Sequence, residues 1–120
     1  MKENIVQEKS YAFALRTVKL YRWLCEDKKE FVLSKQVLRS GTSIGANVEE
    51  AIGGHSEKDF HSKMTIAYKE ARETHYWLRL LHDAGLIDDK AYQSVIADCE
   101  ELLKILGTIT KTMKLKIHNS

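Results

Sequence analysis

Apolar side chains recur along this chain at alternating intervals of three and four residues, a spacing that places them on one face of an α-helix. Four segments show the pattern, and each predicts one helix. The first segment carries Tyr11, Ala14, Val18, Tyr21 and Cys25. The second carries Val37, Gly41, Ile44, Val48 and Ala51, flanked one residue later by Leu38, Gly45 and Ile52. The last two carry Phe60, Met64, Ala67, Ala71, Thr74, Leu78 and Leu81, then Tyr92, Val95, Cys99, Leu102, Leu106, Ile109 and Met113.

Polar residues and a glycine mark the ends of the predicted helices. Ser56 is a predicted N-cap because an acid, Asp59, follows three residues later, and Asp88 is a predicted cap for the last helix. Gly85 stands where a C-cap would end the third helix. The chain has no proline and no alternating strand pattern. Residues 1–120 are therefore predicted to form a single all-α domain, an antiparallel up-down four-helix bundle.

The stretch "RSGTSIGANVEEAIGG", residues 39–54, combines glycines with polar side chains. A phosphate-binding loop would need a preceding strand and a Gly-Lys-Ser/Thr ending, and this stretch has neither. Gly41 lies on the apolar face of the second helix and Gly45 lies beside it. We expect them to let a neighbouring helix approach closely, at a cost of about 1 kcal/mol of helix propensity each. Gly53 and Gly54 are expected to end the helix.

The titratable residues show no spacing that is typical of a catalytic or metal site. No acid has a histidine three residues later, and no two histidines lie three or four residues apart. A metal site assembled across helices stays open at this point. His61, Tyr68, His75 and His82 recur every seven residues and could form a ligand row, but amphipathic side chains at the edge of a helix interface explain them better. We assign no catalytic residue, no metal and no cofactor, and expect no enzymatic activity.

Charge and cysteine content narrow the choice of compartment and partner. The 19 Lys and Arg residues against 17 Asp and Glu residues give a net charge of +2, too small to identify a nucleic-acid-binding protein by itself. Cys25 and Cys99 are isolated in the sequence, and the first ten residues lack the apolar run of a signal peptide or membrane span. These features predict a cytoplasmic protein with reduced thiols and no membrane partner.

Residues 34–88 resemble the family of four-helix bundle proteins, also known as intervening-sequence proteins of 23S ribosomal RNA genes. The motifs "SIGANVEEA", "SEKDFHSKMTIAYKEARET" and "LHDAGLID" carry the resemblance. Relatives commonly have proline where Gly45 stands and glycine where Ala51 stands. The resemblance implies a four-helix bundle in a ribosomal RNA context, without catalytic activity. The chain is also similar to the accessory variability determinant of diversity-generating retroelements, which implies a ring-shaped homopentamer that binds nucleic acid and a protein partner.

One functional hypothesis is binding of RNA or DNA through basic residues of the first and last helices. These helices carry two runs of basic residues that contain no acid. Because the two helices are neighbours in an up-down bundle, the runs can share one surface that contacts phosphates without sequence preference. The candidate residues are Lys9, Arg16, Lys19, Arg22, Lys111, Lys114 and Lys116. An ordinary solvated helix face is the alternative explanation.

A second hypothesis is a protein-interaction scaffold with no direct nucleic-acid binding, because several large apolar residues lie off the predicted core faces. These residues are Phe13, Leu20 and Trp23 in the first helix and Ile66, Trp77 and Leu80 in the third. Apolar patches with aromatic anchors are typical of interfaces, although wide faces around a large core would also explain them. We predict that these residues join identical subunits in a closed homo-oligomer. The resemblance alone implies that five subunits form the ring.

Overall fold

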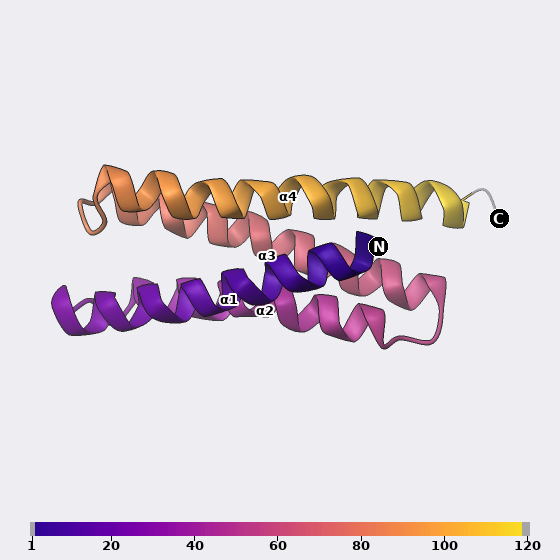
Figure 1. Ribbon diagram of the computed structural model, residues 1–120, viewed down its shortest axis with the longest axis horizontal. Helices are drawn as coiled ribbons and strands as arrows, with labels where there is room; N and C mark the ends of the chain where they lie inside the picture. Colours follow the sequence, from indigo (N-terminus) through magenta and orange to yellow (C-terminus); the bar gives the residue numbers. More distant parts are fainter. Residues whose placement is uncertain (1, 119–120) are drawn as a thin grey trace.

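Four helices follow one another along the chain and run alternately in opposite directions (Figure 1). The computed structural model describes residues 2–118, with side chains from Ile5 onward. The helices are α1 (Lys2–Asp27), α2 (Leu33–Ile52), α3 (Glu57–Asp83) and α4 (Asp89–His118). They form an elongated bundle of 51 × 23 × 21 Å, without strands in the described part of the chain. The predicted all-α four-helix bundle is confirmed.

The apolar faces predicted for α2, α3 and α4 form most of the core. On α2 the five central positions from Val37 to Ala51 are buried, as is Gly45, whereas Leu38 is half-buried and Ile52 is 39% exposed. On α3 and α4 the central positions are buried, while Phe60, Tyr92 and Ile109 pack against the core with part of their surface exposed. Contact between neighbouring helices is extensive for α1 with α2, α2 with α3, and α3 with α4, but much smaller for α1 with α4. The bundle therefore has one shallow seam, between α1 and α4.

Helix α1 turns a different face to the core from the predicted one. Its buried residues are Val6, Ser10, Phe13, Thr17 and Leu24, whereas Tyr11 is 64% exposed. The prediction was wrong because two core positions carry hydroxyl groups, which a search for apolar residues overlooks. Ser10 Oγ donates to the Gln7 carbonyl oxygen at 3.1 Å, and Thr17 Oγ1 donates to the Phe13 carbonyl oxygen at 2.8 Å. With these hydroxyls hydrogen-bonded inside α1, their burial is tolerated.

Small residues at this interface bring α1 and α2 into close contact. A β-carbon added at Gly41 would lie 2.5 Å from Thr17 Cγ2 and 2.6 Å from its Oγ1. One added at Gly45 would lie 3.2 Å from the carbonyl oxygen of Ser10. The backbone of α2 therefore packs directly against α1 at both glycines. The predicted close approach of a neighbouring helix is confirmed.

The predicted caps are present at the start of α3 and at both ends of the α3–α4 connection. Ser56 Oγ accepts a hydrogen bond from the Asp59 N–H at 3.0 Å, and Asp88 Oδ1 accepts one from the Ala91 N–H at 2.8 Å. Gly85 has φ +78, a left-handed conformation that favours glycine, and its N–H donates to the His82 carbonyl oxygen at 3.0 Å. The capping roles predicted for Ser56, Gly85 and Asp88 are therefore confirmed.

Helix α2 begins with a cap that the sequence reading did not predict. The Glu30 carboxylate accepts hydrogen bonds from the backbone N–H groups of Val32, Leu33 and Ser34 at 3.3, 3.0 and 2.7 Å. Partial burial alone would raise the pKa of Glu30, but these three donors outweigh it and lower the pKa below the usual value. A negative charge at the N-terminus of α2 also complements the helix dipole.

Candidate nucleic-acid interface

The basic residues predicted on α1 and α4 do not form one positive surface. Lys9 Nζ lies 3.2 Å from Glu101 Oε1 of α4. Arg16 Nη1 lies 2.7 Å from Asp98 Oδ2, also of α4, and Arg16 Nη2 donates to Ser94 Oγ at 2.6 Å. Acids of α4 thus neutralise part of the α1 run. The prediction of a shared surface was wrong because it counted charges along each helix and not across the seam between them.

The antiparallel arrangement also separates the two runs in space. Lys9 is level with Glu101, so Lys111 lies ten residues further along α4, roughly 15 Å away at about 1.5 Å per residue. Lys19 and Arg22 follow Lys9 along α1 in the opposite direction, toward the other end of the bundle. Lys116 is level with the start of α3, where its Nζ lies 2.8 Å from Glu57 Oε1.

A continuous run of positive charge lies instead on the outer side of α3. Alternating steps of four and three residues connect the exposed or half-exposed positions of this face. They are Lys58, Ser62, Thr65, Lys69, Arg72, Tyr76 and Arg79. From Lys58 to Arg79 the face contains four basic residues and no acid, and the next position in the pattern is Asp83, the last residue of α3. The acids of α3 that lie nearby, Glu70 and Glu73, instead bind Arg39 of α2.

A basic stripe of α4 lies beside this face of α3. It consists of Lys104, Gly107, Lys111 and Lys114, which have the same helical spacing. A β-carbon at Gly107 would lie 3.3 Å from Tyr68 Cε1, and Glu100 Oε2, one turn before Lys104, lies 3.1 Å from His75 Nε2. These contacts put the stripe at the border with α3.

We call Lys58, Lys69, Arg72, Lys104, Lys111 and Lys114 the α3–α4 basic surface. Because Glu100 is level with His75 and Gly107 with Tyr68 in antiparallel helices, Lys104 falls at a level between Lys69 and Arg72. Within residues 5–118, no member of the surface forms an ion pair. Six uncompensated cations on two adjacent helices are the arrangement that neutralises phosphates.

Sequence reasoning named two of these six residues, Lys111 and Lys114, as candidates, and Lys104 belongs to the same basic run of the last helix. It missed Lys58, Lys69 and Arg72 because α3 as a whole contains acids, of which Glu70 and Glu73 bind Arg39 of α2. The signal was nevertheless present in the sequence, as a stripe with steps of four and three residues on α3 that contains no acid from Lys58 to Arg79. A search of each outward helix face, rather than of contiguous sequence, would have found it.

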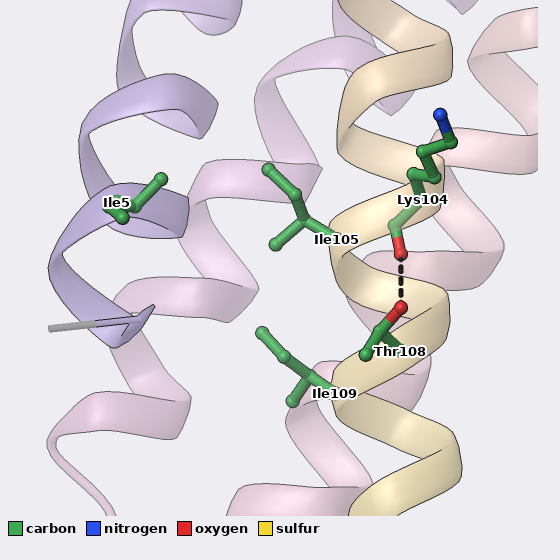
Figure 2. Close-up of a pocket in the computed structure, with 5 residues that line it drawn as sticks. All are labelled: Ile5, Lys104, Ile105, Thr108 and Ile109. Atoms are coloured by element: carbon green, nitrogen blue, oxygen red, sulfur yellow. Dashed lines mark hydrogen bonds between the residues drawn. The ribbon is translucent and has the colours of Figure 1, made fainter.

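Apolar hollows lie along the shallow seam between α1 and α4. Figure 2 shows Ile5 of α1 facing Ile105 and Ile109 of α4 across one hollow of about 280 Å³. The Thr108 hydroxyl is already bonded to the Lys104 carbonyl oxygen at 2.9 Å, and the Lys104 ammonium points away from Ile5 (Figure 2). The walls that face the hollow are therefore apolar.

A second hollow, of about 460 Å³, lies further along the same seam. Its lining includes Leu20 and Trp23 of α1 together with Ala91 and Val95 of α4. Trp23 is 38% exposed, and Lys28 Nζ lies 5.4 Å from the centroid of its ring. The seam thus presents apolar surface on both sides of the Lys9 and Arg16 ion pairs.

The six apolar residues predicted at a subunit interface have different environments. Phe13 is only 3% exposed and belongs to the core, so placing it on the outside was wrong, for the same reason as the rotated α1 face. Leu20 packs partly against that core. Trp77 is half-buried, and its indole N–H donates to Glu73 Oε2 at 2.9 Å. Leu80 is also half-buried, whereas Trp23 is 38% and Ile66 39% exposed.

The histidine row of α3 lies along the interface with α4. His75 bonds Glu100, as described above, and His82 stacks on Tyr92 with ring centroids 4.1 Å apart. A hydrogen bond with Asp89 of α4 raises the pKa of His82. Within the described residues, no cluster of three or more His, Cys, Asp or Glu side chains is placed to hold a metal ion. These contacts give the row an interfacial role.

Comparison with known proteins places the fold in a family. A sequence profile of the 23S rRNA-intervening sequence protein family matches residues 2–108. The chain is also similar to a protein of unknown function from the S23 ribosomal protein family of Bacteroides thetaiotaomicron, with a crystal structure at 1.70 Å resolution. The two are 51% identical, with a TM-score of 0.90, and the match covers 92% of this chain and 99% of that one. No curated protein matches the chain.

Proposed function

The chain belongs to the family of 23S rRNA-intervening sequence proteins, and we propose that it is a non-enzymatic protein that binds RNA through the α3–α4 basic surface. The observation that carries this proposal is the set of six cations on two adjacent helices, none paired with an acid within the described residues. A solvated helix face would normally mix both signs of charge, as the α1–α4 seam does. Acids stand only at the borders of this surface, where Glu100 bonds His75 and Asp83 contacts His82. The resulting excess of positive charge favours a polyanionic partner.

Binding of this kind depends on phosphates and not on base identity. Each cation that contacts a phosphate releases a counterion, so affinity falls steeply as the salt concentration rises. If all six residues contact a single strand, log K should fall with log of salt concentration with a slope of about −4. The small net charge of +2 per chain does not oppose this, because the local field of one face controls the contact.

Self-association is a second part of the proposal. Ile5 and Trp23 leave apolar surface on the α1–α4 seam, at 47% and 38% exposure, and Leu15 of α1 is 51% exposed. A closed homo-oligomer would bury this surface and place several basic surfaces in one particle, which raises avidity for a long polyanion. Five subunits are implied only by the resemblance to the ring-forming proteins. The free thiols of Cys25 and Cys99 support a reducing compartment, the cytoplasm.

The alternative function is a scaffold that binds another protein and no nucleic acid. The hollow formed by Ile5, Ile105 and Ile109 favours this alternative, because an apolar groove beside a polar rim is typical of protein interfaces. A protein partner would occupy the seam and leave the α3–α4 basic surface without a role. Removing the basic residues should therefore abolish function if the protein binds RNA, and should have no effect if it binds a protein at the seam.

Fluorescence anisotropy with a labelled RNA of about 20 nucleotides tests the function directly. The variant Lys69→Gln/Arg72→Gln/Lys104→Gln should weaken binding and make the salt slope shallower by about 2. The matched control Lys19→Gln/Arg22→Gln/Lys35→Gln removes the same charge from α1 and α2 and should leave the affinity nearly unchanged. Equal losses in both variants, or no binding by the wild type in low salt, would contradict the proposal.

Oligomeric state is measured separately by light scattering at micromolar concentration. We expect a mass above that of the 13.8 kDa chain. Trp23→Glu should shift the protein to smaller species while circular dichroism still shows the same helical content, because the indole lies at the edge of the core. A monomeric mass for the wild type would refute self-association, and would leave RNA binding to be judged by anisotropy alone.

A further inference from the structure

Tyr76 and Arg79 continue the outward face of α3 beyond the α3–α4 basic surface and form a pair of flat groups there. Tyr76 is 49% exposed, and Arg79 Cζ lies 5.8 Å from the centroid of its ring. The ring of Trp77 meets that of Tyr76 nearly at right angles, with centroids 5.0 Å apart. The pair thus forms a surface of aromatic and guanidinium character that the core does not use.

The position of this pair is fixed by contacts on the far side of α3. Trp77 is held by the hydrogen bond from its indole N–H to Glu73 Oε2, and Glu73 also binds Arg39 of α2. Tyr76 rests against this anchored indole. Preorganised groups lose less conformational entropy when a ligand binds them.

No acid forms an ion pair with Arg79 in the part of the chain that the structure describes. Asp83, one turn further along α3, is engaged by His82, with Oδ1 and Nδ1 3.3 Å apart. Glu100 of α4 is engaged by His75. Within residues 5–118 Arg79 forms no ion pair, so its guanidinium is available both to stack and to attract a phosphate.

The spacing connects the pair to the cations. Arg72, Tyr76 and Arg79 are separated by four and three residues, about 5–6 Å of helix rise each, and the whole face from Lys58 to Arg79 is about 32 Å long. A strand whose phosphates follow the cations would bring its bases within reach of the ring. Unpaired bases stack on aromatic rings and on arginine planes, whereas a duplex keeps its bases inside the helix.

We propose that the outward face of α3 binds single-stranded RNA, with phosphates along the α3–α4 basic surface and one unstacked base on the Tyr76–Arg79 pair. This inference rests on the proposed function and adds the strandedness of the ligand and a base-stacking site. Phosphate contacts alone would bind duplex and single-stranded RNA alike. The preference for a single strand therefore comes from base stacking on the Tyr76–Arg79 pair.

Anisotropy with two RNAs of equal nucleotide number, and so of equal charge, tests the proposal, one unstructured and one folded on itself into a hairpin duplex. Wild type should bind the unstructured strand more tightly. Tyr76→Ala should weaken that binding about tenfold, and Tyr76→Phe should retain it because the ring remains. Tyr11→Ala is the matched control, since Tyr11 is a 64% exposed tyrosine on α1, and it should have no effect.

An abasic strand separates stacking from charge. Wild type should lose affinity for a strand without bases, while Tyr76→Ala should cost nothing further on that strand. The salt slope should be the same for wild type and Tyr76→Ala, because the phosphate contacts are intact.

Two results would overturn the stacking inference alone. The first is that wild type binds strand and duplex with equal affinity and Tyr76→Ala has no effect. The second is that Tyr11→Ala loses as much affinity for the single strand as Tyr76→Ala does. Failure of the wild type to bind either RNA would instead refute the proposed function.

Discussion

Replacing Gly41 with alanine should expose how tightly α1 and α2 are packed. The new β-carbon would lie 2.5 Å from Thr17 Cγ2, 2.6 Å from Oγ1 and 3.0 Å from Cβ. Rotation of the Thr17 side chain does not remove the last contact, and it breaks the 2.8 Å hydrogen bond from Oγ1 to the Phe13 carbonyl oxygen. The helices must therefore separate. Overpacking of this kind costs about 1–3 kcal/mol, against about 1 kcal/mol gained in helix propensity.

A double-mutant cycle with Thr17→Ala isolates the packing contribution. Thr17→Ala removes Cγ2 and Oγ1, so Gly41→Ala in that background needs only a small shift and should be neutral or stabilising. We expect a coupling free energy of about 1–3 kcal/mol from urea unfolding. Gly53→Ala is the control, since its β-carbon would make only ordinary contacts, with the carbonyl oxygens of Glu49 at 3.6 Å and Glu50 at 4.0 Å. Equal effects of Gly41→Ala in both backgrounds would refute the close-packing account.

Two further predictions concern the ends and the thiols of the bundle. Glu30→Gln should lower the free energy of unfolding by about 1 kcal/mol at pH 7, since a helix cap is weakened. Because the pKa of Glu30 is lowered in the folded state, this stabilisation is present above the unfolded-state pKa and is lost as pH falls through the folded-state pKa. The difference between Glu30→Gln and wild type in urea unfolding should therefore shrink as the pH is lowered through that range. Burial raises the pKa of the Cys99 thiol to about 12. Iodoacetamide should therefore modify Cys99 only after denaturation; rapid native labelling would contradict its burial.

Helix number, helix ends and most of the core follow from local chemistry that the sequence displays. The faces of α2, α3 and α4 are marked by apolar residues with helical spacing, and Ser56 and Asp88 mark caps. The rotation of α1 does not follow in the same way. Its buried Ser10 and Thr17 pack against Gly45 and Gly41 of α2. This contact lies between two helices, so the spacing of apolar residues within one helix does not reveal it.

The candidate site depends on contacts between helices even more than the core does. Lys9 and Arg16 look available in the sequence, but acids of α4, more than eighty residues away in the chain, neutralise them. Conversely, the sequence of α3 contains charges of both signs, but Glu70 and Glu73 bind Arg39 of α2 and do not lie on the outer face. Charge on a helix face can be read from the sequence only when its neighbours are known.

Lysine footprinting tests the central claim, RNA binding on the α3–α4 basic surface, most directly. The native protein is acylated with and without a saturating single-stranded RNA, and mass spectrometry gives the reactivity of each lysine. Lys69, Lys104 and Lys111 should be protected by the RNA, while the exposed lysines Lys19 and Lys35 on α1 and α2 should react equally in both samples. Protection confined to Lys19 and Lys35, or no protection at any lysine, would contradict the account.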